Sequence, residues 1–159
     1  MEGTTDSWVP IASVLGSLAV FLLIWLGSLY AMARWSGWRQ LAAAYPPSDV
    51  LGRGLGETFR MRSITLRNGL HYNLCVSITA SPSALHISMP WLFSAGHAPI
   101  EVPWSEIRSE PSLVWWIPVV RLRFARTPSV PFSVRRRLAV ALARASGGQL
   151  ALPPGTRGH

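Results

Sequence analysis

No charged side chain occurs between Asp6 and Arg34, and residues 9–32 within this stretch are almost all apolar. An α-helix rises about 1.5 Å per residue and the hydrocarbon layer of a bilayer is about 30 Å thick, so the stretch is long enough to cross a membrane. We therefore predict a short leader at residues 1–8 and a transmembrane helix at residues 9–33.

Two alternatives to a membrane anchor were weighed. A buried helix of a soluble protein rarely runs beyond about 14 residues without a charge. A cleaved signal peptide has some support, because Ala31-Met32-Ala33 resembles a cleavage site. However, the leader contains Glu2 and Asp6 and no basic residue, and the apolar run is about twice as long as in a signal peptide. The sequence therefore favours a permanent anchor.

Arginines follow the predicted helix, at Arg34, Arg39 and Arg53, whereas the leader is acidic. Because basic flanks stay on the cytoplasmic side, we expect the N-terminus outside and the C-terminal domain in the cytoplasm, at a plasma (inner) membrane. Aromatic residues near the two ends of the helix are expected to anchor it at headgroup depth. These residues are Trp8, Tyr30, Trp35 and Trp38.

The chain is strongly basic, with fifteen arginines, no lysine and seven acidic residues, a net charge of +8. Residues 34–159 hold all fifteen arginines and five of the acidic residues, so this part carries +10. A basic body beside anionic headgroups gains roughly 1 kcal/mol for each basic residue that reaches them. We therefore expect the lipid bilayer as a partner, and either anionic headgroups or an envelope protein as the contact of the basic surface.

A short helix and a linker are predicted within residues 34–56. Ser36-Gly37 interrupts the helical pattern, and apolar residues then recur at spacings of three and four up to Pro46-Pro47. This pattern predicts a helix that is capped by Ser36, is stopped by the prolines and packs on the bilayer or on the following domain. A plain spacer is the alternative. Residues 48–56, with three glycines, form the linker.

From residue 57 onward, apolar and polar side chains alternate, which indicates strands with one buried and one solvated face. The alternation is clearest at residues 70–79. Asn68-Gly69 before them is the pair best suited to a two-residue type I′ hairpin turn, so residues 57–67 are predicted to be the partner strand.

This turn sets a register that places Phe59 opposite Ile78 and Met61 opposite Val76. The alternation of the second strand then directs Phe59 and Met61 into the core and the neighbouring arginines outward. A turn at residues 80–83, followed by another alternating run, predicts a third strand.

A helical period returns near the C-terminus, where Ser133 is a suitable N-cap and Gly147-Gly148 a suitable stop. We therefore predict an α+β domain at residues 57–148, in which six to seven antiparallel strands form a bent sheet or partial barrel closed by a C-terminal helix. Residues 149–159 are expected to form a flexible tail.

This order of strands with one terminal helix resembles the pleckstrin-homology-like superfold, including its GRAM-type members. Residues 90–93, 96–99 and 100–107, together with Ser36-Gly37-Trp38-Arg39, resemble segments of small bacterial single-pass membrane proteins without an assigned activity. The resemblance implies the fold and the membrane topology. It leaves lipid and protein partners open, because the superfold serves both. Its phosphoinositide-binding members use a long first loop, which the predicted turn at Asn68-Gly69 does not provide.

Three consecutive arginines, residues 135–137, fall in the first turn of the last helix, where the helix dipole disfavours cations. This local conflict favours an anionic partner, although solvated arginines lying over apolar surface are the alternative. Outward-facing strand positions add further arginines. The predicted contact residues are Arg60, Arg62, Arg121, Arg123, Arg135, Arg136 and Arg137.

Trp115-Trp116 is a further unusual pair. Neighbouring residues on a strand point to opposite faces, so we expect one of the two side chains in the core and the other at the surface. The surface tryptophan is then either a docking anchor or covered by another segment.

No metal site, cofactor or catalytic residue is predicted. His71 and Cys75 share a strand face but lie four residues apart, about 13 Å, which is too far for one ion. Catalysis would require Ser105, Glu106 and His97 to converge in a pocket. No nucleic-acid-binding motif accompanies the basic residues, so nucleic acid is not an expected partner.

The sequence therefore predicts a membrane-anchored, non-enzymatic binding or scaffold protein. An accessory subunit of a membrane complex is the first alternative, because small residues on the apolar helix permit close helix packing. A small membrane-bound enzyme is the second.

Overall fold

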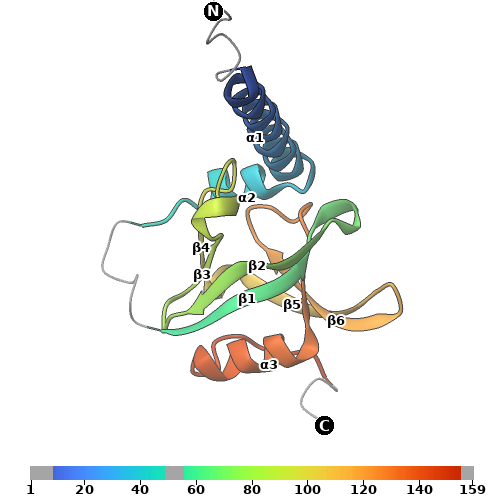
Figure 1. The fold of residues 1–159 in the computed structure, drawn as a ribbon. Coiled ribbons are helices and arrows are strands. Elements are labelled where there is room, and N and C mark those ends of the chain that lie inside the picture. Colours follow the sequence, from blue (N-terminus) through green and yellow to red (C-terminus); the bar gives the residue numbers. More distant parts are fainter. Residues whose placement is uncertain (1–8, 49–55, 155–159) are drawn as a thin grey trace, which may run out of the picture.

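The computed structural model describes residues 9–48 and 56–154, so the predicted anchor Trp8 and the flanking Arg53 lie outside the described residues. The chain forms an N-terminal helix, a curled sheet and a C-terminal helix (Figure 1). The helices are α1 (Val9–Trp35), α2 (Trp38–Ala44) and α3 (Arg136–Ala145). The strands are β1 (Glu57–Thr65), β2 (His71–Ala80), β3 (Ala84–Ser88), β4 (Ile100–Pro103), β5 (Ile107–Val114), β6 (Ile117–Phe124) and β7 (Phe132–Arg135).

The seven strands form one antiparallel sheet in the order β4-β3-β2-β1-β7-β6-β5. The sheet curls into a half-barrel, with α3 along one side of it and α1 on the opposite side (Figure 1). The prediction of a bent antiparallel sheet closed by a C-terminal helix is confirmed. The sheet therefore lies between α1 and α3.

The interior of the half-barrel is filled by alternate residues of the strands and by one face of α3. β6 contributes Val120, Leu122 and Phe124, while Leu138 and Leu142 of α3 cover them from the end of the sheet. This follows from the two periods in the sequence, because alternate strand residues and every third or fourth helical residue point the same way. The strands and α3 therefore share one hydrophobic core.

α3 begins later than predicted. Ser133 is not its N-cap but a buried residue of β7, and Arg135 stands at the cap position. The strand pairing of β7 with β1 and β6 extends through Ser133 and so displaces the helix start. The predicted stop is confirmed: Gly147 and Gly148 have positive φ, and their N–H groups bond to Arg144 and Ala143 in a Schellman motif.

The predicted register of the first hairpin is correct only at its open end. Phe59 lies opposite Ile78, but a β-bulge then adds a residue to β1. Between the pairs Arg62–Val76 and Ile64–Tyr72, a second irregularity adds two residues to β2. Met61 in the first irregularity and Leu74 in the second each have a φ of 52° and are 62% and 55% exposed. The expectation that Met61 points into the core is therefore wrong. The hairpin is also closed by residues 66–70 rather than by a two-residue turn.

The predicted flexible tail is wrong for the residues nearest α3. Leu150 is buried in the core, and its N–H donates to Ser146 Oγ at 3.2 Å. The Schellman motif reverses the chain and thereby returns Leu150 to the domain.

α1 is the one helix in the described part of the chain that is long and apolar enough to span a membrane, and none of its most apolar window is buried. Its C-terminal half contacts the domain: Leu29 and Ala33 are buried, and the Trp25 ring packs on Phe93.

Candidate functional site

A buried polar cluster joins α1 to the half-barrel. The Tyr72 hydroxyl lies 2.8 Å from Ser36 Oγ and 3.0 Å from His97 Nε2. His97 Nδ1 lies 3.0 Å from the Ala95 carbonyl, which can only accept, so Nδ1 carries the proton. Burial lowers the pKa of His97 and raises the pKa of Tyr72 to about 12, so both side chains are neutral near pH 7.

Trp38 belongs to this junction and not to the membrane interface. Its side chain is fully buried, its indole Nε1 donates to the Ala98 carbonyl at 2.8 Å, and its ring packs against Tyr72 and His97. The prediction of Trp38 as a headgroup anchor is therefore wrong. Trp38 and Leu41 of α2 are buried against the domain. The segment is therefore a helix that packs on the domain, and not a plain spacer. The α2 N-cap is Gly37 (φ 85°), while Ser36 Oγ accepts from the Trp38 N–H.

Three arginines surround the C-terminal end of α1: Arg34, Arg39 and Arg67, here named the juxtamembrane arginine patch. They line one shallow hollow together with Trp35 and Gln40. Arg67 comes from the β1–β2 loop and donates to Gln40 Oε1 at 3.0 Å. Sequence reasoning missed Arg67, because only the tertiary contact with α2 brings it there.

The remaining predicted anchors lie beside this patch. Tyr30 is 50% exposed, and its hydroxyl accepts a hydrogen bond from Arg39 at 2.7 Å. The Arg39 guanidinium also lies 4.9 Å from the centre of the Tyr30 ring. Trp35 is 68% exposed. The side chains of Tyr30 and Trp35 are therefore both exposed near the C-terminal end of α1.

A second group of arginines lines a groove between the β1–β2 bulge and α3. Arg62, Arg135 and Arg137 border this hollow of about 550 Å³, named here the arginine groove, and its lining includes no acidic residue. The exposed, positive-φ residues Met61 and Leu74 line it as well. One wall of the groove is α3, which lies on the side of the sheet opposite α1 (Figure 1), and the other wall is formed by β1 and β2.

The other predicted contact residues have different surroundings. Arg123 is paired with Glu110 at 2.8 Å. Arg121 is half-buried, and its Nε has no hydrogen-bond partner among the described residues. Arg60 is exposed on β1, and Arg136 is half-buried at the start of α3. The structure thus brings three of the seven predicted arginines into the groove.

Trp115 and Trp116 form the two-residue turn between β5 and β6, a hairpin that projects to the right in Figure 1. Both have positive φ, as a type I′ turn requires, and they are 80% and 92% exposed. The expectation that one of them enters the core is wrong, because neither lies within a strand. With the exposed Leu113 and Ile117 they form an apolar hairpin tip.

The hairpin tip adjoins the arginine groove. A hollow of about 310 Å³ is lined by Trp115, Ile117 and Arg135, and Arg135 also lines the arginine groove. The two surfaces are therefore continuous, with large apolar side chains at one end and three guanidinium groups at the other.

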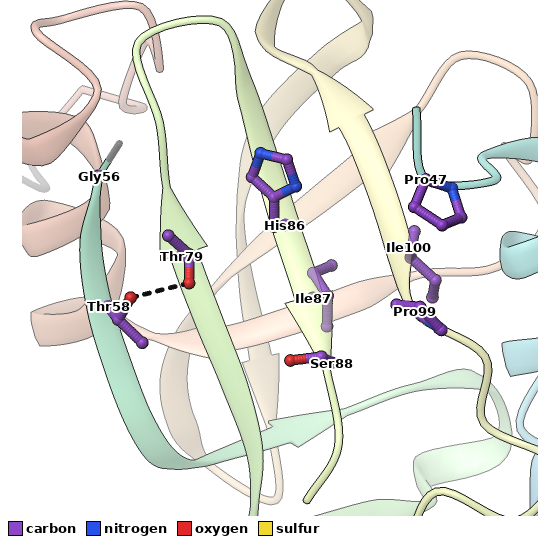
Figure 2. A pocket seen from close by; sticks show the side chains of 9 residues that line it. All are labelled: Pro47, Gly56, Thr58, Thr79, His86, Ile87, Ser88, Pro99 and Ile100. Carbon is purple, nitrogen blue, oxygen red and sulfur yellow. Dashed lines mark hydrogen bonds between the residues drawn. The ribbon is translucent and has the colours of Figure 1, made fainter. Parts of the chain in front are cut away.

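A separate hollow of about 260 Å³ lies over β1 to β4 (Figure 2). Thr58 and Thr79 form a hydrogen bond in its wall, and the nearby His86 ring lies 3.7 Å from Glu101. Among the described residues, no arginine lines it. This hollow is therefore distinct from both basic surfaces.

The groups considered for catalysis do not converge. His97 belongs to the Tyr72 cluster, whereas Glu106 accepts hydrogen bonds from Tyr45 at 2.9 Å and from Arg126 at 2.7 Å. Bonding to Arg126 holds the pKa of Glu106 below its ordinary value. Within residues 9–48 and 56–154, no three His, Cys, Asp or Glu side chains lie together as metal ligands would.

No protein-family model matches the chain, and no curated protein matches it in sequence. The two basic surfaces and the hairpin tip are therefore the features that bear on function.

Proposed function

We propose that the protein is a single-pass, non-enzymatic binding or scaffold protein of a plasma (inner) membrane, with α1 in the bilayer and the half-barrel in the cytoplasm. In this proposal the domain is pleckstrin-homology-like, which the curled seven-stranded sheet closed by α3 supports. The observation that carries the binding role is the continuous surface formed by the arginine groove and the hairpin tip.

The juxtamembrane arginine patch is the proposed lipid contact. It lies where the apolar helix ends, so Arg34, Arg39 and Arg67 would meet anionic headgroups as soon as α1 spans the bilayer. Each basic residue at the surface contributes roughly 1 kcal/mol. Tyr30 and Trp35 would sit at the same depth.

The arginine groove is proposed to bind an acidic segment of a protein. Its α3 wall lies on the side of the sheet opposite α1, which argues against the bilayer that would hold α1 as its partner. Exposed tryptophans beside arginines are the residue types that dominate protein interfaces. An acidic segment carrying an apolar side chain would match both ends of the surface.

An accessory-subunit role is the second candidate. A side chain added at Gly16 or Gly27 of α1 would meet no atom within 4 Å, so both glycines face open space. Close approach of another helix is possible there.

Photo-crosslinking of the full chain in native membranes tests these roles. A photoreactive residue at position 116 is expected to capture a protein with an acidic segment. Substituting Arg62, Arg135 and Arg137 together by Gln should reduce capture at least tenfold, a loss of about 1.4 kcal/mol. Substituting Arg34, Arg39 and Arg67 together by Gln, which removes the same charge outside the groove, is the matched control.

Capture of lipid alone from position 116, or equal capture by the groove variant and the control, would contradict the proposed protein partner. Capture of a membrane protein from position 16 but not from position 116 would favour the accessory-subunit role instead.

A further inference from the structure

We propose that residues 91–93 are a second membrane-contacting element, which enters the same leaflet as the C-terminal half of α1 and rests on the boundary between headgroups and acyl chains. This inference rests on the proposed insertion of α1. It adds a lipid contact on a segment far from α1 in the sequence.

Direct contacts hold this segment against α1. The rings of Phe93 and Trp25 are 5.7 Å apart between centroids. A Cβ atom built on Gly96 would lie 3.2 Å from Tyr30 and 3.4 Å from Ala33, so glycine permits this close approach. The segment after β3 accordingly lies beside the lower end of α1 in Figure 1.

The contact with Trp25 fixes the depth. Trp25 precedes Arg34 by nine residues, about 14 Å along a helix axis. If Arg34 is at headgroup level, a side chain packed on Trp25 lies at or below the edge of the hydrocarbon layer. Phe93 would therefore be surrounded by lipid on the sides that α1 leaves open.

The surface of the segment suits this position. Trp91 is 85% exposed and Leu92 48% exposed, and no Asp, Glu, Lys or Arg lies between Arg67 and Glu101. Large exposed apolar side chains are unfavourable in water and favourable at the membrane interface, where tryptophan is enriched.

The backbone of the segment bonds mostly within itself. Phe93 N–H donates to the Pro90 carbonyl at 2.9 Å and His97 N–H to the Ser94 carbonyl at 2.8 Å. Ser94 donates to the Trp91 carbonyl through both its N–H and its hydroxyl. Such pairing is what a segment needs where water is scarce. Together with α1, the segment would give the domain two attachment points and so a fixed orientation.

Site-directed spin labelling of the full chain in lipid nanodiscs tests the inference. Nitroxides are attached in a Cys75→Ala background at Trp91→Cys, with Leu22→Cys on α1 and Trp116→Cys on the hairpin as references. All three positions are exposed in the absence of lipid, so labelling leaves the core intact. Collisions with oxygen and with a water-soluble nickel chelate report the surroundings of each label.

We expect the labels at positions 91 and 22 to favour oxygen at least several-fold more than the label at position 116. If position 22 is in lipid but position 91 is as accessible to the chelate as position 116, the inference is wrong and the membrane anchor stands. If position 22 is itself accessible to the chelate, the proposed anchor fails and the inference fails with it.

Discussion

At the scale of single residues, the junction between α1 and the domain depends on a few buried polar atoms. Tyr72, His97 and Ser36 come from three distant segments, and each places a polar atom in one cluster. The sequence indicated His97 only as a possible catalytic residue. Its partners could not be predicted, because they follow from tertiary packing and not from local spacing.

The buried imidazole predicts a pH-dependent stability. Burial lowers the pKa of His97 below 6.5, so the unfolded chain takes up this proton before the folded protein does. The free energy of unfolding should be highest above pH 6.5 and should fall as the pH drops below that value. Urea titrations followed by tryptophan fluorescence at about pH 7.5 and about pH 5.5 measure the difference.

His97→Gln is the control for this prediction, because it keeps an acceptor for Tyr72 but does not titrate. The variant should lose less stability over the same interval. Arg126 holds the pKa of Glu106 below its ordinary value, so this carboxylate remains charged throughout the interval. An equal decrease in both proteins would assign the effect to another group.

The burial of individual tryptophans also depends on tertiary packing and could not be predicted from local sequence. Trp38, expected at the membrane, is in the core, whereas Trp115 and Trp116 are both at the surface. Local alternation does not distinguish a strand from a two-residue turn. The pair lies between two strands of equal length, residues 107–114 and 117–124, but apolar and polar residues do not alternate regularly along them.

At the scale of elements, the β5–β6 hairpin keeps a turn that is unfavourable for its residues. Trp115 and Trp116 have φ values of 47° and 66°, and left-handed conformations cost a residue other than glycine about 1–2 kcal/mol. Asn-Gly is the preferred sequence for this turn. The turn conformation therefore does not favour these two residues, which agrees with the binding role proposed for them.

We predict that Trp115→Asn combined with Trp116→Gly stabilises the protein by about 1 kcal/mol and abolishes partner capture. Thermal unfolding and crosslinking from a groove position, such as residue 137, measure the two effects. Trp91→Asn, an exposed tryptophan outside the residues with positive φ, is the control and should give no gain in stability. A hairpin variant that is less stable yet still captures the partner would contradict the prediction.

The elements themselves were largely predictable. Alternation in the sequence predicted the strands around residues 70–79 and 85–89, and the two glycines predicted the end of α3. The misplaced features are those that non-local contacts determine. The bulge at Met61 depends on the partner strand, and the burial of Leu150 depends on the core under α3.

At the scale of the whole molecule, the two basic surfaces are formed by different elements and share no lining residue. The juxtamembrane arginine patch surrounds the base of α1, and the arginine groove lies against α3 (Figure 1). Net charge alone predicted a single basic body. The fold divides that charge into two surfaces that can be tested independently.

We predict that substituting Arg34, Arg39 and Arg67 together by Gln reduces the enrichment of anionic lipid around the protein, with up to roughly 1 kcal/mol lost per residue. Native mass spectrometry of lipid-bound protein from mixed nanodiscs measures the enrichment. The groove variant, with Arg62, Arg135 and Arg137 changed to Gln, loses the same amount of charge. It should retain the enrichment of anionic lipid. Equal loss in both variants would mean that lipid binding follows net charge rather than position.

Because α1 is closely attached to the domain, the orientation of the domain follows the orientation of α1. Ala33 is fully buried and Gly96 leaves little room beside it, so α1 cannot bend there without opening the core. A membrane helix tilts when its apolar length exceeds the local thickness of the bilayer. Every degree of tilt would then be transmitted to the half-barrel and would swing the arginine groove through an arc, so that bilayer thickness sets how far the groove reaches.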